Sequence, residues 1–308
     1  MGDVVEILMA VYNGAAFLPA QLDSILTQTD GHWHLTASDD GSDDGSAEIL
    51  ADYARRHPDK ISVHRSGQRF GGARDHFFHL MANCPAEIML FCDQDDVWRP
   101  DKVERMRAAF KDAAREHGPD IPTLVFSDQT PTDAALRPLA DSLMRYQHQY
   151  FERFDYRSIL MQNVVTGGAM GVNRALAELA LRRKDLGPVR MHDWWLAAVA
   201  ARFGHIVYID APLGIYRQHG DNAVGAKRVD GAAYIAGRLG ALHAVRETIL
   251  RKKAQAAAFR DTYRDRLDAG DLAFLDAFAR PRSGAGFWLK YQGLIHGLQR
   301  KLGFLFLC

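Results

Sequence analysis

The chain has 308 residues, and 47% of them are hydrophobic, which is enough to bury a large core. Lysine plus arginine and aspartate plus glutamate both number 38, so the formal net charge is zero, which argues against a general nucleic-acid-binding protein. The three cysteines, Cys84, Cys92 and Cys308, form no Cys-x-x-Cys pair, which predicts reduced thiols. The sequence shows no secretory signal at its start and no apolar run near the ~20 residues of a membrane span. We therefore expect a cytoplasmic protein.

The first third of the chain alternates apolar runs with amphipathic segments. Strands are expected at Val4–Val11, Trp33–Ala37, Ile61–His64 and Ile88–Cys92, with helices between them. This alternation predicts an α/β fold: a mainly parallel, Rossmann-like sheet with helices on both faces. Ligands of such sheets bind beyond the carboxyl ends of the strands, so the polar residues that follow each strand are candidates for a binding site.

The pattern changes along the rest of the chain. A charged helix is expected from Arg99 to His117, followed by a strand at Thr123–Ser127 and an irregular stretch at Thr130–Gln149. A glycine-rich turn at Asn163–Arg174 precedes a helix, another helix begins at His192, and a last strand is expected at Ile206–Ile209. We therefore predict a catalytic domain at residues 1–225 and a helical extension at residues 226–308.

Three carboxylates follow the fourth strand within four positions: Asp93, Asp95 and Asp96. Carboxylates this close repel one another unless a cation or hydrogen-bond donors neutralise them. Two of them at positions i and i+2 can reach one hard cation that keeps free positions for phosphate oxygens. An acidic loop that caps a helix is the alternative, and it is common for an isolated Asp-x-Asp.

Two further loops carry charged residues beside glycines. In Ser-Asp-Asp-Gly-Ser-Asp-Asp-Gly-Ser, Asp39 and Asp40 end the second strand and could accept hydrogen bonds from the N–H groups of a nucleotide base. Helix capping explains part of the same motif. In the loop from Ser66 to Arg74, Arg74 is the candidate phosphate contact, because it lies closest to the next helix.

Asp193 is flanked by His192, Trp194 and Trp195. A carboxylate beside indole rings can have a raised pKa and act as a general base, and the rings could stack on a sugar. His219 follows the last strand, where it could contact a metal or a diphosphate, although a lone turn histidine is more often structural.

Seven segments occur in an order that resembles family 2 glycosyltransferases. Within that family, the resemblance is to the bacterial rhamnosyltransferase-like branch, which acts in O-antigen or other polysaccharide assembly. The segments are AVYNG, SDDGSDDGS, ARDHF, FCDQDDVWRPDK, TGGAMGVNR, HDWWLA and YRQHGDN, spread over about residues 4 to 225. The resemblance implies a GT-A fold, inversion at the anomeric carbon, a divalent metal (Mn²⁺ or Mg²⁺), a dTDP- or UDP-linked sugar donor and a glycan or lipid-linked acceptor.

The resemblance also implies roles for individual residues. The donor-binding residues would be Ala10, Tyr12, Asp39, Asp40, Arg74, Asp93 and Gln94. Asp95 would be the main metal ligand, with Asp93 and His219, and Asp193 would be the catalytic base. The acceptor and sugar pocket would comprise Gly167, Gly168, His192, Trp194 and Trp195. Ala10, Arg69 and Asp75 depart from the usual pattern, which has proline at the first position and asparagine at the other two.

Other classes are disfavoured by the loop after the first strand, Tyr12–Ala16. A nucleotidyltransferase would carry a glycine-rich basic loop there, and a dehydrogenase would carry Gly-x-Gly-x-x-Gly. A catalytically silent sugar-nucleotide-binding scaffold would have no need to retain the clustered carboxylates. For the extension, the apolar spacing from Phe287 to Leu302 fits packing on the main domain, a homodimer contact or a peripheral membrane helix on the inner face of the membrane.

Overall fold

The computed structural model describes residues 4–149, 154–219, 242–280 and 284–294. Four strands and three helices alternate at the start of the chain. They are β1 (Val5–Val11), α1 (Leu18–Leu26), β2 (Trp33–Asp39), α2 (Ser46–Arg56), β3 (Ile61–Val63), α3 (Ala73–Ala82) and β4 (Ile88–Asp93). The predicted order of elements in this region is therefore confirmed.

The second half of the sheet is less regular. It comprises β5 (Val97–Trp98), α4 (Lys102–His117), β6 (Thr123–Thr132), α5 (Leu143–Tyr146), α6 (Tyr156–Met161), the 3-10 turn η1 (Gly167–Ala169), β7 (Met170–Asn173), α7 (Arg174–Ala180), α8 (His192–Phe203) and β8 (His205–Arg217). β6 extends to Thr132 and β8 to Arg217, well past the ends that apolar residues alone predict, and β5 and β7 were not predicted as strands.

All eight strands form one sheet in the order β3-β2-β1-β4-β7-β6-β8-β5. Strands β1 to β4 pair in parallel, and β6 pairs in parallel with β8. β7 runs antiparallel between β4 and β6, and β5 runs antiparallel to β8. The sheet therefore has four parallel pairs and three antiparallel ones, so the predicted mainly parallel α/β sheet is confirmed, and the antiparallel strands β5 and β7 are additions that the sequence did not indicate.

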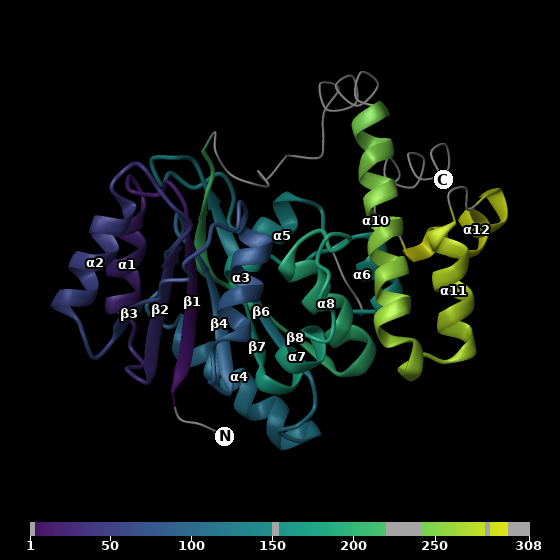
Figure 1. Cartoon of the computed structure of the whole chain (residues 1–308), viewed down its shortest axis with the longest axis horizontal. Helices are drawn as coiled ribbons and strands as arrows, with labels where there is room; N and C mark the ends of the chain where they lie inside the picture. Colours follow the sequence, from purple (N-terminus) through teal and green to yellow (C-terminus); the bar gives the residue numbers. More distant parts are fainter. Residues whose placement is uncertain (1–3, 150–153, 220–241, 281–283, 295–308) are drawn as a thin grey trace.

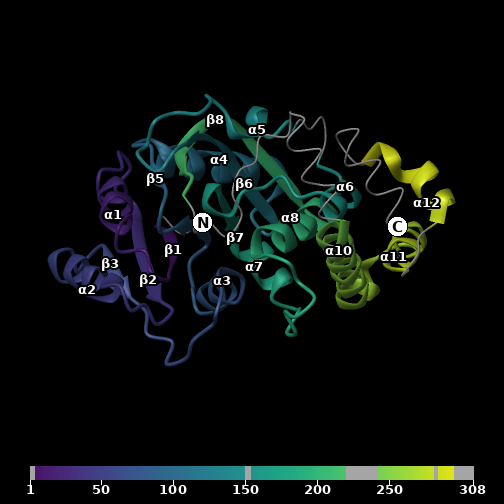
Figure 2. The same cartoon turned by 90° about the horizontal axis from the view of Figure 1, so that it is seen from above.

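Helices cover both faces of the sheet, as Figures 1 and 2 show. One face packs on α1, α2 and α4 through a core that includes Leu22, Leu50 and Phe110. The other face packs on α3, α6, α7 and α8. Cys84 and Cys92 are buried free thiols, as predicted, and Cys308 lies outside the described residues.

The C-terminal helices continue the second core. They are α10 (Leu242–Tyr263), the 3-10 turn η2 (Arg264–Arg266), α11 (Ala269–Ala279), α12 (Gly284–Tyr291) and the 3-10 turn η3 (Gln292–Leu294). Phe259 of α10 packs edge-on against Trp195 of α8, with ring centroids 5.7 Å apart. On α11, Asp271 accepts hydrogen bonds from Tyr156 Oη at 2.6 Å and Arg202 Nε at 2.6 Å.

The apolar side chains at the start of the segment Phe287–Leu302 face the protein. Phe287 stacks on Phe278 with centroids 5.7 Å apart and is buried, whereas Leu289 is exposed. Packing on α11 therefore accounts for the burial of Phe287, and the choice between packing on the main domain, a homodimer contact and a membrane contact stays a prediction, since residues 295–308 lie outside the described residues. Among the described helices, none is both long and apolar enough to cross a membrane.

Candidate active site

The register of the parallel strands aligns their carboxyl ends. Val11 pairs with Asp39 on one side, and its neighbour Ala10 pairs with Asp93 on the other. β7 begins at the same edge because it runs antiparallel to β4, which brings the turn η1 beside Asp93. Residues from distant parts of the sequence thus meet at one edge of the sheet.

Tyr12 and Gln94 join the loops after β1 and β4. The backbone N–H of Tyr12 donates to Gln94 Oε1 at 2.7 Å, and Gln94 Nε2 donates to the carbonyl oxygen of Tyr12 at 2.9 Å. A Cβ on Gly14 would lie only 2.5 Å from Gln94 Cδ, so the close approach requires glycine there. Gln94 therefore positions the Tyr12 loop, while the ring of Tyr12 is 47% exposed and lies 4.9 Å from the Arg69 guanidinium carbon.

Asp39 and Asp40 are already hydrogen-bonded within the protein. Asp40 is buried, and its two carboxylate oxygens accept the backbone N–H groups of Phe70 at 2.5 Å and Gly71 at 2.8 Å. Asp39 accepts the N–H groups of Gly41 and Ser42, both at 3.0 Å. In this state both carboxylates organise the loops around the predicted base site, and a role in contacting a base stays a prediction.

Arg74 lies in the first turn of α3 and joins two loops. It forms a two-point ion pair with Asp75 at 2.8 and 2.9 Å, and its Nη1 donates to the carbonyl oxygen of Val189 at 2.7 Å. Val189 precedes α8, so Arg74 links the glycine-rich loop to the segment that carries Asp193. Its predicted phosphate contact is not tested by these interactions.

A cluster of buried charges surrounds the end of β4. Burial, together with the charges of Asp95 and Asp193, raises the pKa of Asp93 to about 7. Burial and the charge of Asp93 likewise raise the pKa of Asp96 well above its usual range. Gln129 Nε2 donates to Asp96 Oδ2 at 2.9 Å. Burial and mutual repulsion of the carboxylates thus disfavour their charged forms, and a bound cation would favour those forms.

Lys102 is the cation that sequence reasoning missed. It is fully buried, and its Nζ donates to the carbonyl oxygen of Gly168 at 2.7 Å and lies 3.9 Å from the centre of the Trp98 ring. The backbone N–H of Gly168 in turn donates to Asp93. Both sides of this peptide are thus held, and a Cβ on Gly168 would lie 2.7 Å from Asp93 Oδ2. A lysine directly after Trp98-Arg99-Pro100-Asp101 in an acidic segment was the available signal.

His219 lies beside Asp95, as the resemblance implied. His219 Nε2 is 2.7 Å from Asp95 Oδ2, and the imidazole packs on Phe17 with centroids 4.4 Å apart. Among the described residues, no group of three His, Cys, Asp or Glu side chains is arranged to hold a metal. Asp93 and Asp95 nevertheless fit a hard cation chemically, because both are carboxylates at an edge where negative charge accumulates.

Asp193 lies beside the turn η1, in the first turn of α8. Its Oδ1 accepts the backbone N–H of Trp194 at 2.6 Å, and burial raises the pKa of its carboxyl group to about 7. A pKa near neutrality suits a general base. A Cβ on Gly167 would lie 3.9 Å from Asp193 Cβ, and one on Gly168 would lie 2.7 Å from Asp93 Oδ2, so the two carboxyl groups lie beside neighbouring glycines of the same turn.

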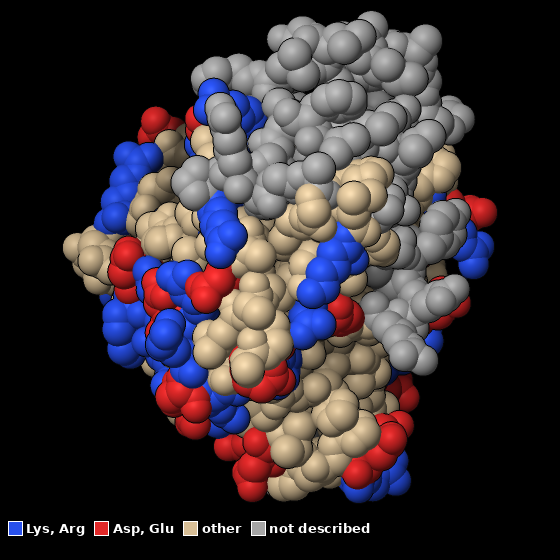
Figure 3. Space-filling model, turned by 90° about the vertical axis from the view of Figure 1, so that its right-hand side faces the viewer, with Lys and Arg blue, Asp and Glu red and all other residues tan. Residues whose placement is uncertain are grey.

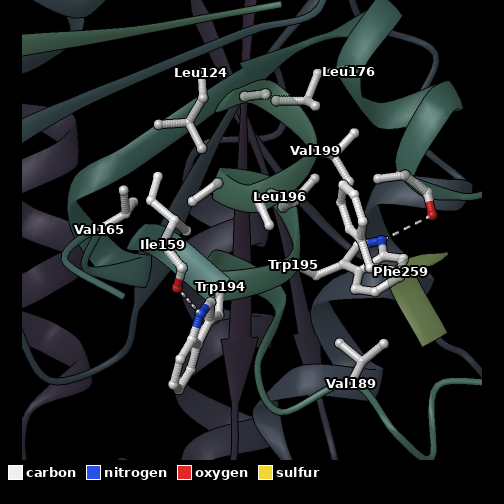
Figure 4. Packing of buried hydrophobic residues seen from close by; sticks show 14 of the residues in the cluster. Leu124, Ile159, Val165, Leu176, Val189, Trp194, Trp195, Leu196, Val199 and Phe259 are labelled. Carbon is white, nitrogen blue, oxygen red and sulfur yellow. Dashed lines mark hydrogen bonds between the residues drawn. The ribbon is translucent and has the colours of Figure 1, made fainter. Parts of the chain in front are cut away.

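The residues next to Asp193 have mixed roles. The imidazole of His192 is buried between Phe77 and Phe91, and neither ring nitrogen has a hydrogen-bond partner in the described part of the chain. Trp194 is largely buried and donates to the carbonyl oxygen of Ile159 (Figure 4). Trp195 is fully buried against α10 and donates to Ala180. The prediction that Trp195 lines a sugar pocket is therefore corrected: it is a core residue.

The α/β sheet with flanking helices and acidic side chains at its carboxyl edge is a GT-A glycosyltransferase fold, as comparison with solved structures shows. The crystal structure of S. aureus TarS in complex with UDP-GlcNAc superposes with a TM-score of 0.59 at 14% identity, over 98% of this chain and 78% of that one. The mannosyltransferase PcManGT from Pyrobaculum calidifontis, in complex with GDP-Man and Mn²⁺, gives 0.52 at 16% identity, over 97% and 77%.

The chain belongs to glycosyl transferase family 2, whose model matches residues 6–178. It is 28% identical to the dTDP-rhamnosyl transferase RfbG of Shigella flexneri over 230 residues. The aligned region covers 71% of this chain and 74% of that one. The protein is thus a glycosyltransferase with relatives in bacterial polysaccharide synthesis. The family match ends before Asp193, so the candidate base rests on the geometry above.

Proposed function

We propose that the protein is an inverting, metal-dependent glycosyltransferase that moves a deoxyhexose, rhamnose, from a dTDP- or UDP-linked donor to a hydroxyl group of a glycan or lipid-linked acceptor in bacterial surface polysaccharide synthesis. The observation that carries the proposal is that two buried carboxyl groups adjoin one turn, Asp193 beside Gly167 and Asp93 beside Gly168. A donor diphosphate beside Asp93 and an acceptor hydroxyl beside Asp193 would then meet at this turn. The likeness to the dTDP-rhamnosyl transferase supports the choice of sugar.

The chemistry divides between these two sides. The carboxylate of Asp193 removes the proton of the acceptor hydroxyl group. At the same time the oxygen of that hydroxyl group attacks the anomeric carbon of the donor sugar from the face opposite the leaving nucleotide. The bond to the diphosphate breaks through an oxocarbenium-like state. A divalent cation held by Asp93 and Asp95 would neutralise the charge that grows on the leaving diphosphate. Tyr12 would contact the base, and the exposure of its ring at the same edge supports this role.

The test compares Asp193→Asn with the wild-type chain. Nucleotide binding is measured first, by thermal shift with dTDP and UDP in the presence of Mn²⁺, Mg²⁺ or chelator. Sugar transfer is then followed with dTDP-rhamnose, and the anomeric configuration of the product is read by NMR. We expect metal-dependent binding in both proteins and a fall in kcat of about 10²–10⁴-fold in the variant.

The exposed Asp112 gives a matched control, since Asp112→Asn removes the same charge from the far end of α4. It should leave both nucleotide binding and turnover unchanged. Equal loss of nucleotide affinity and turnover in Asp193→Asn would make Asp193 a binding or structural residue. A wild-type chain that binds no nucleotide with metal present would contradict the transferase proposal and favour a scaffold.

A further inference from the structure

Basic side chains gather around the ring of Trp194, directly after Asp193. The guanidinium carbon of Arg190 lies 4.9 Å from the ring centre, and Lys252 Nζ lies 5.6 Å from it. The first group comes from the loop before α8 and the second from α10. Because the backbone N–H of Trp194 donates to Asp193, this basic region adjoins the proposed base.

Arg190 is held in place by uncharged groups. Its Nη1 donates to the carbonyl oxygen of Thr248 at 3.1 Å, and its backbone N–H donates to Gln255 Oε1 at 2.8 Å. No carboxylate lies within ion-pair distance of its guanidinium in the part of the chain that the structure describes. Burial, and then the charge of Arg251, lowers the pKa of Arg190, whereas the charge of Asp193 opposes this shift.

Arg251 and Lys252 lie on the same face of α10 as the carbonyl group that Arg190 contacts. They follow Thr248 by three and four residues, which places them one helical turn away. Glu247 belongs to the same helix, but within the described residues it forms no ion pair with Arg251. Lys and Arg side chains are exposed at the surface on this side of the molecule (Figure 3).

Half-buried arginines elsewhere in the protein have carboxylate partners. Arg157 and Arg202 both bind Asp271, and Arg107 binds Asp30. Cations brought together without such partners are costly unless an anion joins them, and guanidinium groups bind phosphate oxygens through two parallel hydrogen bonds. The surplus of positive charge beside Asp193 therefore indicates that an anionic ligand binds there.

We infer that Arg190, Arg251 and Lys252 form a phosphate-binding subsite, and that the acceptor carries a phosphate ester or diphosphate close to the hydroxyl group that attacks the sugar. The inference rests on the proposed function, since it assigns the subsite to the acceptor. Three cations against one nearby carboxylate match a multiply charged phosphate better than a singly charged carboxylate. The donor diphosphate belongs to the opposite side of the turn η1, beside Asp93.

The test uses the full chain saturated with dTDP and Mg²⁺, so that the donor site is filled. Inorganic phosphate or acetate is then titrated in at an ionic strength matched with chloride, and binding is followed by tryptophan fluorescence and by thermal shift. We expect saturable binding of phosphate, with acetate at least tenfold weaker. Arg251→Gln, which changes an exposed side chain, and Arg190→Gln should each weaken phosphate binding at least tenfold, with the affinity for dTDP unchanged.

The control is Arg115→Gln, an exposed arginine of α4 on another part of the surface. It should bind phosphate like the wild-type chain. Phosphate binding that is absent from the wild-type chain, or that persists in Arg251→Gln and Arg190→Gln, overturns the subsite while leaving the donor site intact. Tighter binding of acetate overturns the assignment to phosphate. A wild-type chain that binds phosphate but no nucleotide contradicts the proposed function, and with it the assignment to an acceptor.

Discussion

The proposed donor side and the proposed acceptor side of the site are built from different kinds of neighbours. Donor-side residues follow β1, β2 and β4, which are adjacent strands within the first 93 residues, and the strand register aligns them. The acceptor side depends on α8 and on α10, which begins 49 residues after Asp193. Residues at the ends of adjacent strands are therefore positioned by the strand register, whereas the position of Asp193 depends on packing between helices that are distant in the sequence.

The largest effect should come from removing the packing on which the acceptor side depends. Phe259→Ala deletes a fully buried ring that contacts Trp195 and Tyr263, and we expect a loss of about 3–5 kcal/mol in the free energy of unfolding. Leu250→Ala, at an exposed position on the same helix, is the control and should change stability little. Chemical denaturation measures both.

The number of unfolding transitions shows whether α10 and the sheet unfold together. If α10 belongs to the same cooperative unit as the sheet, Phe259→Ala shifts one transition seen by both tryptophan fluorescence and circular dichroism. A separate early transition, with the sheet unaffected, would show that the C-terminal helices fold as an independent extension.

A smaller effect should come from crowding the turn between the two sides. A Cβ on Gly167 would lie 2.9 Å from His192 Nε2, and His192 begins α8. Gly167→Ala should therefore displace Asp193 and lower kcat by about 10²-fold, because small misplacements of a catalytic group have effects of this size. Steady-state kinetics with a dTDP-binding measurement checks it.

Gly31→Ala is the matched control, since an added Cβ there meets no atom within 4 Å. It should leave kcat unchanged. If Gly167→Ala instead weakens dTDP binding and leaves kcat intact, the turn serves the donor side alone.

The smallest effect concerns pH and separates stability from activity. Burial raises the pKa of Asp193 to about 7, so between about pH 4 and pH 7 the folded chain binds more protons than the unfolded chain at this group, and stability falls as pH rises. Asp193→Asn removes this penalty and should be more stable than the wild-type chain at pH 8, by about 1–2 kcal/mol, but not at pH 4.

Turnover should change in the opposite direction. The wild-type kcat/KM is expected to rise with pH through about 7 as Asp193 ionises. Melting curves and rates at pH 4 to 8 test both halves of the prediction. A stability difference between Asp193→Asn and the wild-type chain that does not vary with pH would show that the carboxyl group is not ionised at a cost in the folded state.

Much of the donor side was predictable because each strand ends in a polar cluster after an apolar run. The extra length of β6 was not, since its last residues, Ser127 to Thr132, are polar apart from Pro131 and yet buried. Their burial depends on pairing with β8 and on Asp128, which accepts the N–H groups of Leu143 and Met144. β7 has only four residues and contains Gly171, so its strand character comes from its neighbours.

The acceptor side was predicted by motif and misassigned in part. Asp193 was found because it lies between a histidine and two tryptophans, but the sequence does not distinguish Trp194 from Trp195. Helical geometry turns their side chains by about 100°, and only the position of α10 decides which ring is fully covered. Lys102 was missed because a lysine at the start of a charged helix is normally exposed.

The contact between Phe259 and Trp195 also determines where this protein can be shortened. The family match ends at residue 178 and the last strand ends at Arg217, so either point would look like a natural boundary for a recombinant fragment. A fragment that stops at residue 178 would lack α8 altogether, and one that stops at Arg217 would expose Trp195 and Tyr156 to water and leave Arg202 without Asp271. The smallest fragment that retains this core reaches at least the end of α11.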